Sequence, residues 1–436
     1  MADKKRNNLF AAVGAATGLG NAFRFPALCV SYGAAFVFAY GAALALVCFP
    51  LLCAELHFGR RAGNVRRAKL WAFIMRVAAA NSALIALYYA VIASKLGSAC
   101  LSFACFAVAE ADLSTVFFIV TAVLVTAVVF VLLSRGQMAL AVSGRLSVGL
   151  SLALFFFLAV KGIVRGGAFS SLNFSALLGG SIWADALGQA LLALSLAAGV
   201  MPSFARAQGA DFSVPRTAFI IVAANFAGCL LALFSTLPFV SQFPQTDGIN
   251  CALTVYPQVV AAVAKNQASA RVFGTLVYAV LTVVAVHSLA SLATPAITLV
   301  RKKIKFAPAI FCVDSALLLP LFSSFGLQVL SACDRAACSV SAILIAFAEC
   351  LFFASQRDIK GANKPFMRFL CPLACGSLAL FSLCSARFGC FSPFAAACAF
   401  IALAATWACG PLPQLTYFAK RVKILRKKKL RYEKDS

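Results

Sequence analysis

Charged residues are scarce in this chain. Asp, Glu, Lys and Arg make up 12% of its 436 residues, whereas 63% are hydrophobic. Soluble domains carry about 25% charged residues, so the shortage excludes a soluble domain. A chain this apolar is typical of an all-α polytopic membrane protein, because helices satisfy their own backbone hydrogen bonds in lipid.

Acidic residues and histidines are the scarcest polar types, with 13 Asp and Glu and 2 His against 38 Lys and Arg. The sequence shows no paired catalytic carboxylates, no metal cluster and no nucleophile beside a base, so it predicts that the protein is not an enzyme. The 17 Cys include no C-x-x-C pair. Most lie in apolar stretches and act there as small hydrophobic residues; only Cys333 and Cys338 form a pair to check.

Apolar stretches of bilayer-crossing length number about twelve. They are predicted at residues 9–30, 34–58, 77–107, 113–133, 146–164, 182–204, 218–240, 272–300, 306–325, 336–354, 366–384 and 391–412. Residues 1–8 are polar and too short for a cleavable signal, so we expect the first span to stay in the protein.

The excess of basic residues gives the orientation. Most of the 38 Lys and Arg residues fall in the segments that are cytoplasmic if the N-terminus is inside. The positive-inside rule then predicts that both termini, including a basic tail at 413–436, lie on the cytoplasmic side of the plasma membrane. We expect the tail to meet anionic lipid headgroups and expect no nucleic-acid partner.

The first span is interrupted by glycines. Gly14–Pro26 reads G-A-A-T-G-L-G-N-A-F-R-F-P, which is poor material for a continuous helix. We therefore expect an unwound joint near residues 15–18, whose free carbonyls suit a small cation, and a second half-helix from Leu19–Gly20, whose positive end suits an anion. A zwitterion beside a cation fits both.

The stretch G-L-G-N-A-F-R-F-P resembles the first-helix signature of the neurotransmitter:sodium symporter family, which includes bacterial leucine and tryptophan transporters. The resemblance continues through Y-G-A-A-F at residues 32–36 and through P-L, E and F-G-R within residues 50–60. A weaker resemblance extends to about Glu349. It implies a transporter in which helices 1 and 6 are broken near the substrate site.

The sixth span repeats the interruption, since L-S-L-A-A-G at residues 194–199 is followed by Pro202. Two interrupted helices five spans apart predict a 5+5 inverted repeat, with the repeats at 9–164 and 182–354, spans 11 and 12 within 366–412, and the two breaks facing each other. The loop at 241–270 is expected to form a helical lid, as in the family, or else a plain connector.

The resemblance implies a first sodium site built from oxygen atoms, as a hard cation requires. Its ligands would be the Ala16 carbonyl, the Asn21 side chain, the backbone of Ala193, the Asn225 side chain and the substrate carboxylate. Relatives usually carry Ser or Thr in place of Ala193. The alternative is that both asparagines are packing amides, although an amide inside a membrane helix needs a partner.

The implied substrate pocket is mostly small and apolar: Ala15, Leu19, Gly20, Ile85, Tyr89, Leu192, Ser195, Ala198, Ser288 and Leu292. Tyr89 would bind the substrate carboxylate together with the backbone amides of the first break, whereas its neighbour Tyr88 is expected to pack, as only one face meets the cavity. Leu192 and Ala198 stand where relatives often have aromatic residues. The larger volume favours a bulky apolar amino-acid side chain.

Arg24 and Asp334 resemble the external gate of the family, an ion pair that closes over the occupied site. The alternative is that Arg24 only extends to the interface. Glu55 is expected to be a structural acid held by hydrogen bonds, ionised or neutral. The acid of the internal gate is replaced by Lys302, so that gate must close differently.

A second sodium site would use Gly14, Thr17, Val284, His287 and Ser288. Imidazole suits softer metals than sodium, so we expect a protonated His287 to replace this ion, or else a neutral ring bonded to a backbone carbonyl. The chloride site of the family would map to Tyr40, Gln189, Ala193 and Cys229. Two hydroxyl ligands are missing there, so chloride dependence is doubtful.

These patterns together predict a secondary symporter that imports an amino acid or small amine by alternating access, coupled to sodium, protons or both. The alternative is a non-transporting membrane sensor or scaffold descended from such a symporter, because both ion sites and the inner gate depart from the family.

Overall fold

The computed structural model describes residues 9–10, 12–61, 67–109, 114–165, 174–208, 212–239, 248–300, 307–317, 334–356 and 363–384. These residues form helices joined by turns and contain no β-strand. The predicted all-α fold is confirmed. Several predictions lie outside the described residues: the segment 1–8, Lys302, Cys333, the end of the ninth span, the twelfth span at 391–412 and the tail at 413–436.

The first segment is broken where its glycines predict. Residues 12–16 are helical, Thr17 and Gly18 are not, and the chain resumes as α2 (Leu19–Ala22) and α3 (Arg24–Tyr32). Gly18 adopts an extended conformation with φ −81° and ψ −166°. The joint is therefore shorter than the predicted 15–18, because the backbone N–H of Thr17 still bonds the Val13 carbonyl at 2.8 Å.

The sixth segment is broken at the predicted residues. Helix α9 (Gly180–Ala193) ends, residues 194–199 form turns, and α10 (Val200–Gln208) follows. Ser195 and Ala197 adopt positive φ angles of 52° and 54°. Such angles are unfavourable for residues with a Cβ and persist only where surrounding contacts hold them.

The remaining helices account for the other described spans. They are α4 (Ala35–Ala43), η1 (Leu44–Cys48) and α5 (Phe49–Arg60) in span 2; α6 (Ala68–Phe106), α7 (Ser114–Arg135) and α8 (Gln137–Arg165) in spans 3 to 5; η2 (Ser175–Leu178) before span 6; α11 (Val214–Thr236) and η3 (Leu237–Phe239) in span 7; α12 (Gly248–Val263) in the loop; α13 (Gln267–Val300) and α14 (Ala307–Leu317) in spans 8 and 9; η5 (Arg335–Ser341) and α16 (Ala342–Ala354) in span 10; and α17 (Asn363–Pro365), η6 (Phe366–Leu370) and α18 (Cys371–Cys384) in span 11.

Two helices begin well before the apolar stretches that the sequence marks. Helix α6 begins at Ala68 rather than at residue 77, and α8 begins at Gln137 rather than at residue 146. The reason is that hydropathy marks only the part of a helix that lies in hydrocarbon, whereas Lys69, Arg76 and Arg145 are good helix formers that let the helix continue past it.

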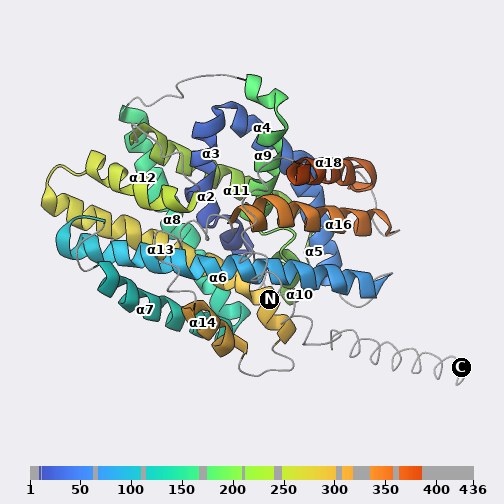
Figure 1. The fold of residues 1–436 in the computed structure, drawn as a ribbon, viewed down its shortest axis with the longest axis horizontal. Coiled ribbons are helices and arrows are strands. Elements are labelled where there is room, and N and C mark those ends of the chain that lie inside the picture. Colours follow the sequence, from blue (N-terminus) through green and yellow to red (C-terminus); the bar gives the residue numbers. More distant parts are fainter. Residues whose placement is uncertain are drawn as a thin grey trace, which may run out of the picture.

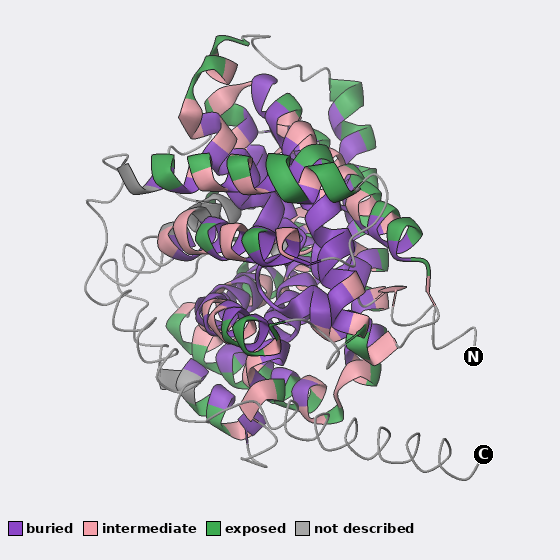
Figure 2. Cartoon of the chain, turned by 90° about the vertical axis from the view of Figure 1, so that its right-hand side faces the viewer, coloured by how far each residue is buried: buried purple, intermediate pink, exposed green. Residues whose placement is uncertain are grey.

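The long helices α6 and α13 pack along each other, with α7 and α14 against them, while α2, α9 and α11 meet in the interior (Figure 1). Buried residues fill the middle of the molecule and exposed residues lie on the outer helices (Figure 2). Seven helical segments of the described chain are long and apolar enough to cross a membrane. Helix α7 exposes apolar side chains such as Val123, which is 64% exposed, as a lipid-facing helix does.

The loop between spans 7 and 8 contains α12, a helix that packs on the first segment. The Tyr256 hydroxyl donates a 3.1 Å hydrogen bond to the Ala22 carbonyl, and its ring meets that of Phe23 edge-on with centroids 5.5 Å apart. The segment is therefore placed where a lid over the first break would sit.

Candidate functional site

The oxygens of the predicted first sodium site come together at the end of the first half-helix. The Ala16 carbonyl accepts hydrogen bonds from Asn21 Nδ2 at 3.2 Å and from Asn225 Nδ2 at 2.6 Å, and the two amides lie 3.4 Å apart. Ala193 lies at the last turn of α9, next to the second break. Three chain segments thus converge on one carbonyl.

These groups fit a hard cation. Asn225 Oδ1 accepts a 2.6 Å hydrogen bond from Tyr40, but a half-turn of the amide would aim this oxygen at the Ala16 carbonyl, and its NH₂ could donate to the tyrosine oxygen. The site would then present the oxygens of Ala16, Asn21 and Asn225 to an ion. In the alternative, in which the two asparagines only pack, their NH₂ groups donate to the Ala16 carbonyl.

The residues of the predicted second site also meet, but an imidazole lies among them. A Cβ on Gly14 would come 2.8 Å from His287 Nε2, and one on Gly18 would come 2.5 Å from Ser288 Oγ. Val284 is buried one turn before His287 in α13. Ser288 Oγ is buried without a hydrogen-bond partner among the described residues, so it offers an oxygen to a ligand.

The His287 ring lies beside serine hydroxyls of α8 and of its own helix α13. Its Nδ1 lies 2.8 Å from Ser143 Oγ and its Nε2 lies 3.5 Å from Ser291 Oγ. Sequence reasoning missed Ser143, because no pattern within α8 marks the serine that faces α13. Thr17 Oγ1 donates to the Val13 carbonyl at 2.9 Å.

The two breaks face each other across the predicted substrate pocket. Ser195 Oγ donates to the Ala15 carbonyl at 3.3 Å, and Gln189 Nε2 donates to the Gly20 carbonyl at 3.1 Å. Leu192 lies 3.6 Å from where a Cβ on Gly20 would be. The start of α2 and the end of α9 are therefore in direct contact beside the two breaks.

The other pocket residues lie on the neighbouring long helices. Ile85 and Tyr89 are one turn apart on α6, and Ser288 and Leu292 are one turn apart on α13; all four are buried, as is Ala198 in the second break. The Leu292 carbonyl accepts a 2.7 Å hydrogen bond from Ser82, which ties the two helices. The side chain of Leu19 is outside the described part.

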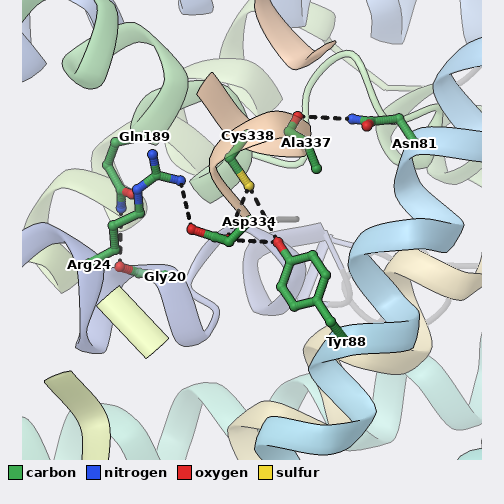
Figure 3. A network of polar contacts seen from close by, with 8 residues as sticks. All are labelled: Gly20, Arg24, Asn81, Tyr88, Gln189, Asp334, Ala337 and Cys338. Carbon is green, nitrogen blue, oxygen red and sulfur yellow. Dashed lines mark hydrogen bonds and ion pairs between the residues drawn. The ribbon is translucent and has the colours of Figure 1, made fainter. Parts of the chain in front are cut away.

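The external gate residues form an ion pair above the breaks (Figure 3). Arg24 Nη1 lies 3.6 Å from Asp334 Oδ2, and their side chains are 12% and 10% exposed. Tyr88 corrects an expectation: it does not merely pack but donates a 2.7 Å hydrogen bond to Asp334 Oδ1. No pattern within α6 marks this role, because the partner of Tyr88 lies in span 10, far along the sequence.

Two further expectations concern acids and chloride. The carboxyl of Glu55 is buried and Oε1 accepts a 2.8 Å hydrogen bond from the backbone N–H of Ala197, as expected of a structural acid.

In the region mapped to chloride, the Tyr40 hydroxyl donates to Asn225 and lies 3.5 Å from Cys229 Sγ.

Broken helices that meet around buried oxygens, within a bundle of apolar spans, agree with the membrane transporter that the sequence predicts. The resemblance seen in the sequence is confirmed: residues 2–108 match the model of the sodium:neurotransmitter symporter family. The fold is similar to that in the crystal structure of MhsT in complex with L-phenylalanine, with a TM-score of 0.73 and 22% identity over 86% of this chain and 98% of that one. No curated protein sequence matches the chain.

Proposed function

We propose that the protein imports a bulky apolar amino acid, coupled to sodium, by alternating access. The observation that carries this proposal is the meeting of the two breaks, where Ser195 reaches the Ala15 carbonyl and Asn21 and Asn225 surround the Ala16 carbonyl. A substrate carboxylate at the start of α2 would complete the oxygen shell of the first ion, so substrate and sodium would bind together.

The substrate class rests on the lining of the pocket. Ile85, Leu192, Ala198 and Leu292 bring aliphatic groups, and Tyr89 brings a hydroxyl for a carboxylate. The crystal structure of MhsT, which has a similar fold, holds L-phenylalanine. A large apolar side chain would gain most from such a surface, because burial of apolar area favours binding by about 25 cal/mol per Å².

In the second ion site we propose that His287 takes the place of sodium and that its protonation couples transport to protons. The ring lies against Gly14, where the second ion would sit, and is oriented by Ser143. Imidazole nitrogen is a poor ligand for sodium. The protein would then use one sodium ion and one proton where relatives use two ions.

Orientation and lipid contacts complete the proposal. Both termini lie in the cytoplasm, because this places most Lys and Arg residues inside. The basic segment at 413–436 meets anionic lipid headgroups, and the excess of basic residues serves topology and lipid contact rather than nucleic acid.

The decisive experiment is counterflow in proteoliposomes loaded with each amino acid in turn. We expect exchange of large apolar amino acids that requires sodium. A small amine exchanged in their place would overturn the substrate class. Absence of exchange, together with no thermal stabilisation of the purified protein by any amino acid, would favour a sensor or scaffold.

A further inference from the structure

Four buried thiols gather where spans 2, 10 and 11 meet, outside the proposed substrate and ion sites. They belong to Cys48 at the end of η1, Cys350 in α16, and Cys371 and Cys375 one turn apart in α18, and all four are fully buried. Helices α16 and α18 pack side by side (Figure 1). The Cys350 thiol thereby lies within hydrogen-bonding reach of the thiols of Cys371 and Cys375, and the Cys48 thiol lies near the same two.

Two π-helical turns bring these thiols together. The turn η1 lies within span 2, η6 leads into α18, and the two turns are in contact. Such turns are rare and are frequently found at functional sites. Cys371, directly after η6, donates to the Leu46 carbonyl of η1 at 3.6 Å and lies 4.0 Å from the Val47 carbonyl. A thiol is a weak donor, so this contact orients the sulfur without holding it strongly, and a better ligand can displace it.

A carboxyl group faces the same cluster. Glu349 precedes Cys350 in α16 and is fully buried, and its carboxyl lies near the Cys375 thiol. Both oxygens of this carboxyl are buried, and no described residue donates a hydrogen bond to them. Buried charged groups are normally paired or bound to a metal. An acid beside four thiols therefore favours a cation, and not an anion, as the ligand of this cluster.

The sulfur atoms decide which cation fits. Thiolates are soft ligands and select Cu(I), whereas hard cations prefer oxygen. Zinc takes four ligands in a tetrahedron, but the described residues contain no group of three or more His, Cys, Asp and Glu arranged to hold a metal ion. Cu(I) has a filled d shell and is satisfied by two sulfur atoms in line. A pair of thiols from two facing helices can supply them.

We propose that Cys350 and one thiol of α18, that of Cys371 or Cys375, bind a single Cu(I) ion and so link span 10 to span 11. One thiol forms the Cu–S bond and gives up its proton to water, while the other binds through a sulfur lone pair and keeps its proton. The ion thus replaces one proton, and neither the net charge of the interior nor the oxidation state of copper or sulfur changes. Binding of the ion does not depend on the proposed transport function.

Titration of the reduced, purified protein with Cu(I), buffered by a coloured Cu(I) chelator, tests the site. We expect the wild type to take one equivalent from the chelator at a lower free Cu(I) concentration than its other thiols require. Cys350→Ala should lose this equivalent. Cys312→Ala is the matched control and should keep it, because the Cys312 thiol is buried in α14 and meets the Thr126 carbonyl at 3.7 Å.

Two results of this titration would overturn the proposal. A wild type without a distinct first equivalent would mean that the four thiols only fill apolar space. An equivalent that persists in Cys350→Ala but is lost in Cys29→Ala would place the ion at another pair of thiols, those of Cys29 and Cys229.

X-ray absorption at the copper edge tests the ligands in the wild type and so does not depend on the folding of a variant. With one equivalent bound, we expect a first shell of two sulfur atoms alone. Oxygen or nitrogen in that shell would contradict a thiol pair. Both measurements use protein that need not transport an amino acid, so their outcome is independent of whether the proposed function is correct.

Discussion

Asn21 is the residue at which we propose that the ion and the substrate are coupled. Its side chain reaches the Ala16 carbonyl, and the start of α2, where a substrate carboxylate would bind, lies two residues before it. Asn21→Ala removes a sodium ligand, so we expect sodium and amino-acid affinity to fall together, each by roughly tenfold or more for a lost charge-assisted contact of about 1.5–3 kcal/mol.

Equilibrium binding of the amino acid over a series of sodium concentrations measures this effect. Asn81→Ala is a suitable control, because Asn81 also donates to a backbone carbonyl, that of Ala337 at 3.2 Å, but lies outside the ion sites. Substrate affinity that is unchanged in Asn21→Ala at every sodium concentration would remove the assignment.

Single residues also show where sequence reasoning stops. Asn21, His287 and Arg24 stand out because a polar residue is conspicuous in an apolar span. Ser143 and Tyr88 do not, because their importance comes from partners in distant spans, His287 and Asp334. A serine or tyrosine in a membrane helix is common, and only the packing of helices tells which partner it meets.

At the scale of elements, the gate joins α3, α6 and the start of span 10 (Figure 3). One carboxylate oxygen of Asp334 pairs with Arg24, and the other accepts a hydrogen bond from Tyr88. Asp334→Ala should therefore impair transport strongly, because it leaves a nearly buried arginine without its partner. Exchanging the charges, Arg24→Asp with Asp334→Arg, should recover part of the loss. An exchange no better than either single variant would leave the pairing unsupported.

The two tyrosines of α6 allow a matched comparison. Tyr88→Phe removes a hydrogen bond to Asp334 and should slow transport by several-fold, consistent with about 1 kcal/mol for one hydrogen bond, while the KM changes little. Tyr89→Phe removes the hydroxyl proposed for the substrate carboxylate and should raise the KM instead. Identical kinetic changes in the two variants would contradict the division of roles between them.

The breaks could be predicted from sequence and the helix ends could not, for a physical reason. Glycines at 14, 18 and 20 and the run at 194–199 oppose a continuous helix at any position in the bilayer. The starts of α6 and α8 have no such signal. Their first residues lie where water and headgroups satisfy charged side chains, so hydropathy falls although the helix continues.

For the whole molecule, composition and charge predict an all-helical membrane protein, and the paired breaks predict its symmetry and the place of its central site. What the sequence cannot give is the chemistry of that site after substitution. A chain that lacks one oxygen at Ala193 and carries an imidazole at His287 still assembles around the same carbonyls. The fold is therefore retained although residues at both ion sites have changed. Which ions drive transport has to be measured on the intact transporter.

Uptake against external pH at fixed sodium is that measurement. The His287 ring lies between Gly14 and Ser143, with Ser291 at 3.5 Å, and free imidazole titrates near pH 6.5. If a protonated His287 replaces the second sodium, uptake should rise as the external pH falls through this region. His287→Thr restores an oxygen and removes the ring, so uptake should become independent of pH and should depend more steeply on the sodium concentration.

His57→Thr is the control, since His57 is the other of the 2 histidines and contacts Arg60 at the end of α5. This variant should keep the wild-type dependence of uptake on pH. Flat wild-type uptake from about pH 5.5 to 8, around the free imidazole pKa, with the same behaviour in His287→Thr, would mean that the ring only fills the space of the second ion.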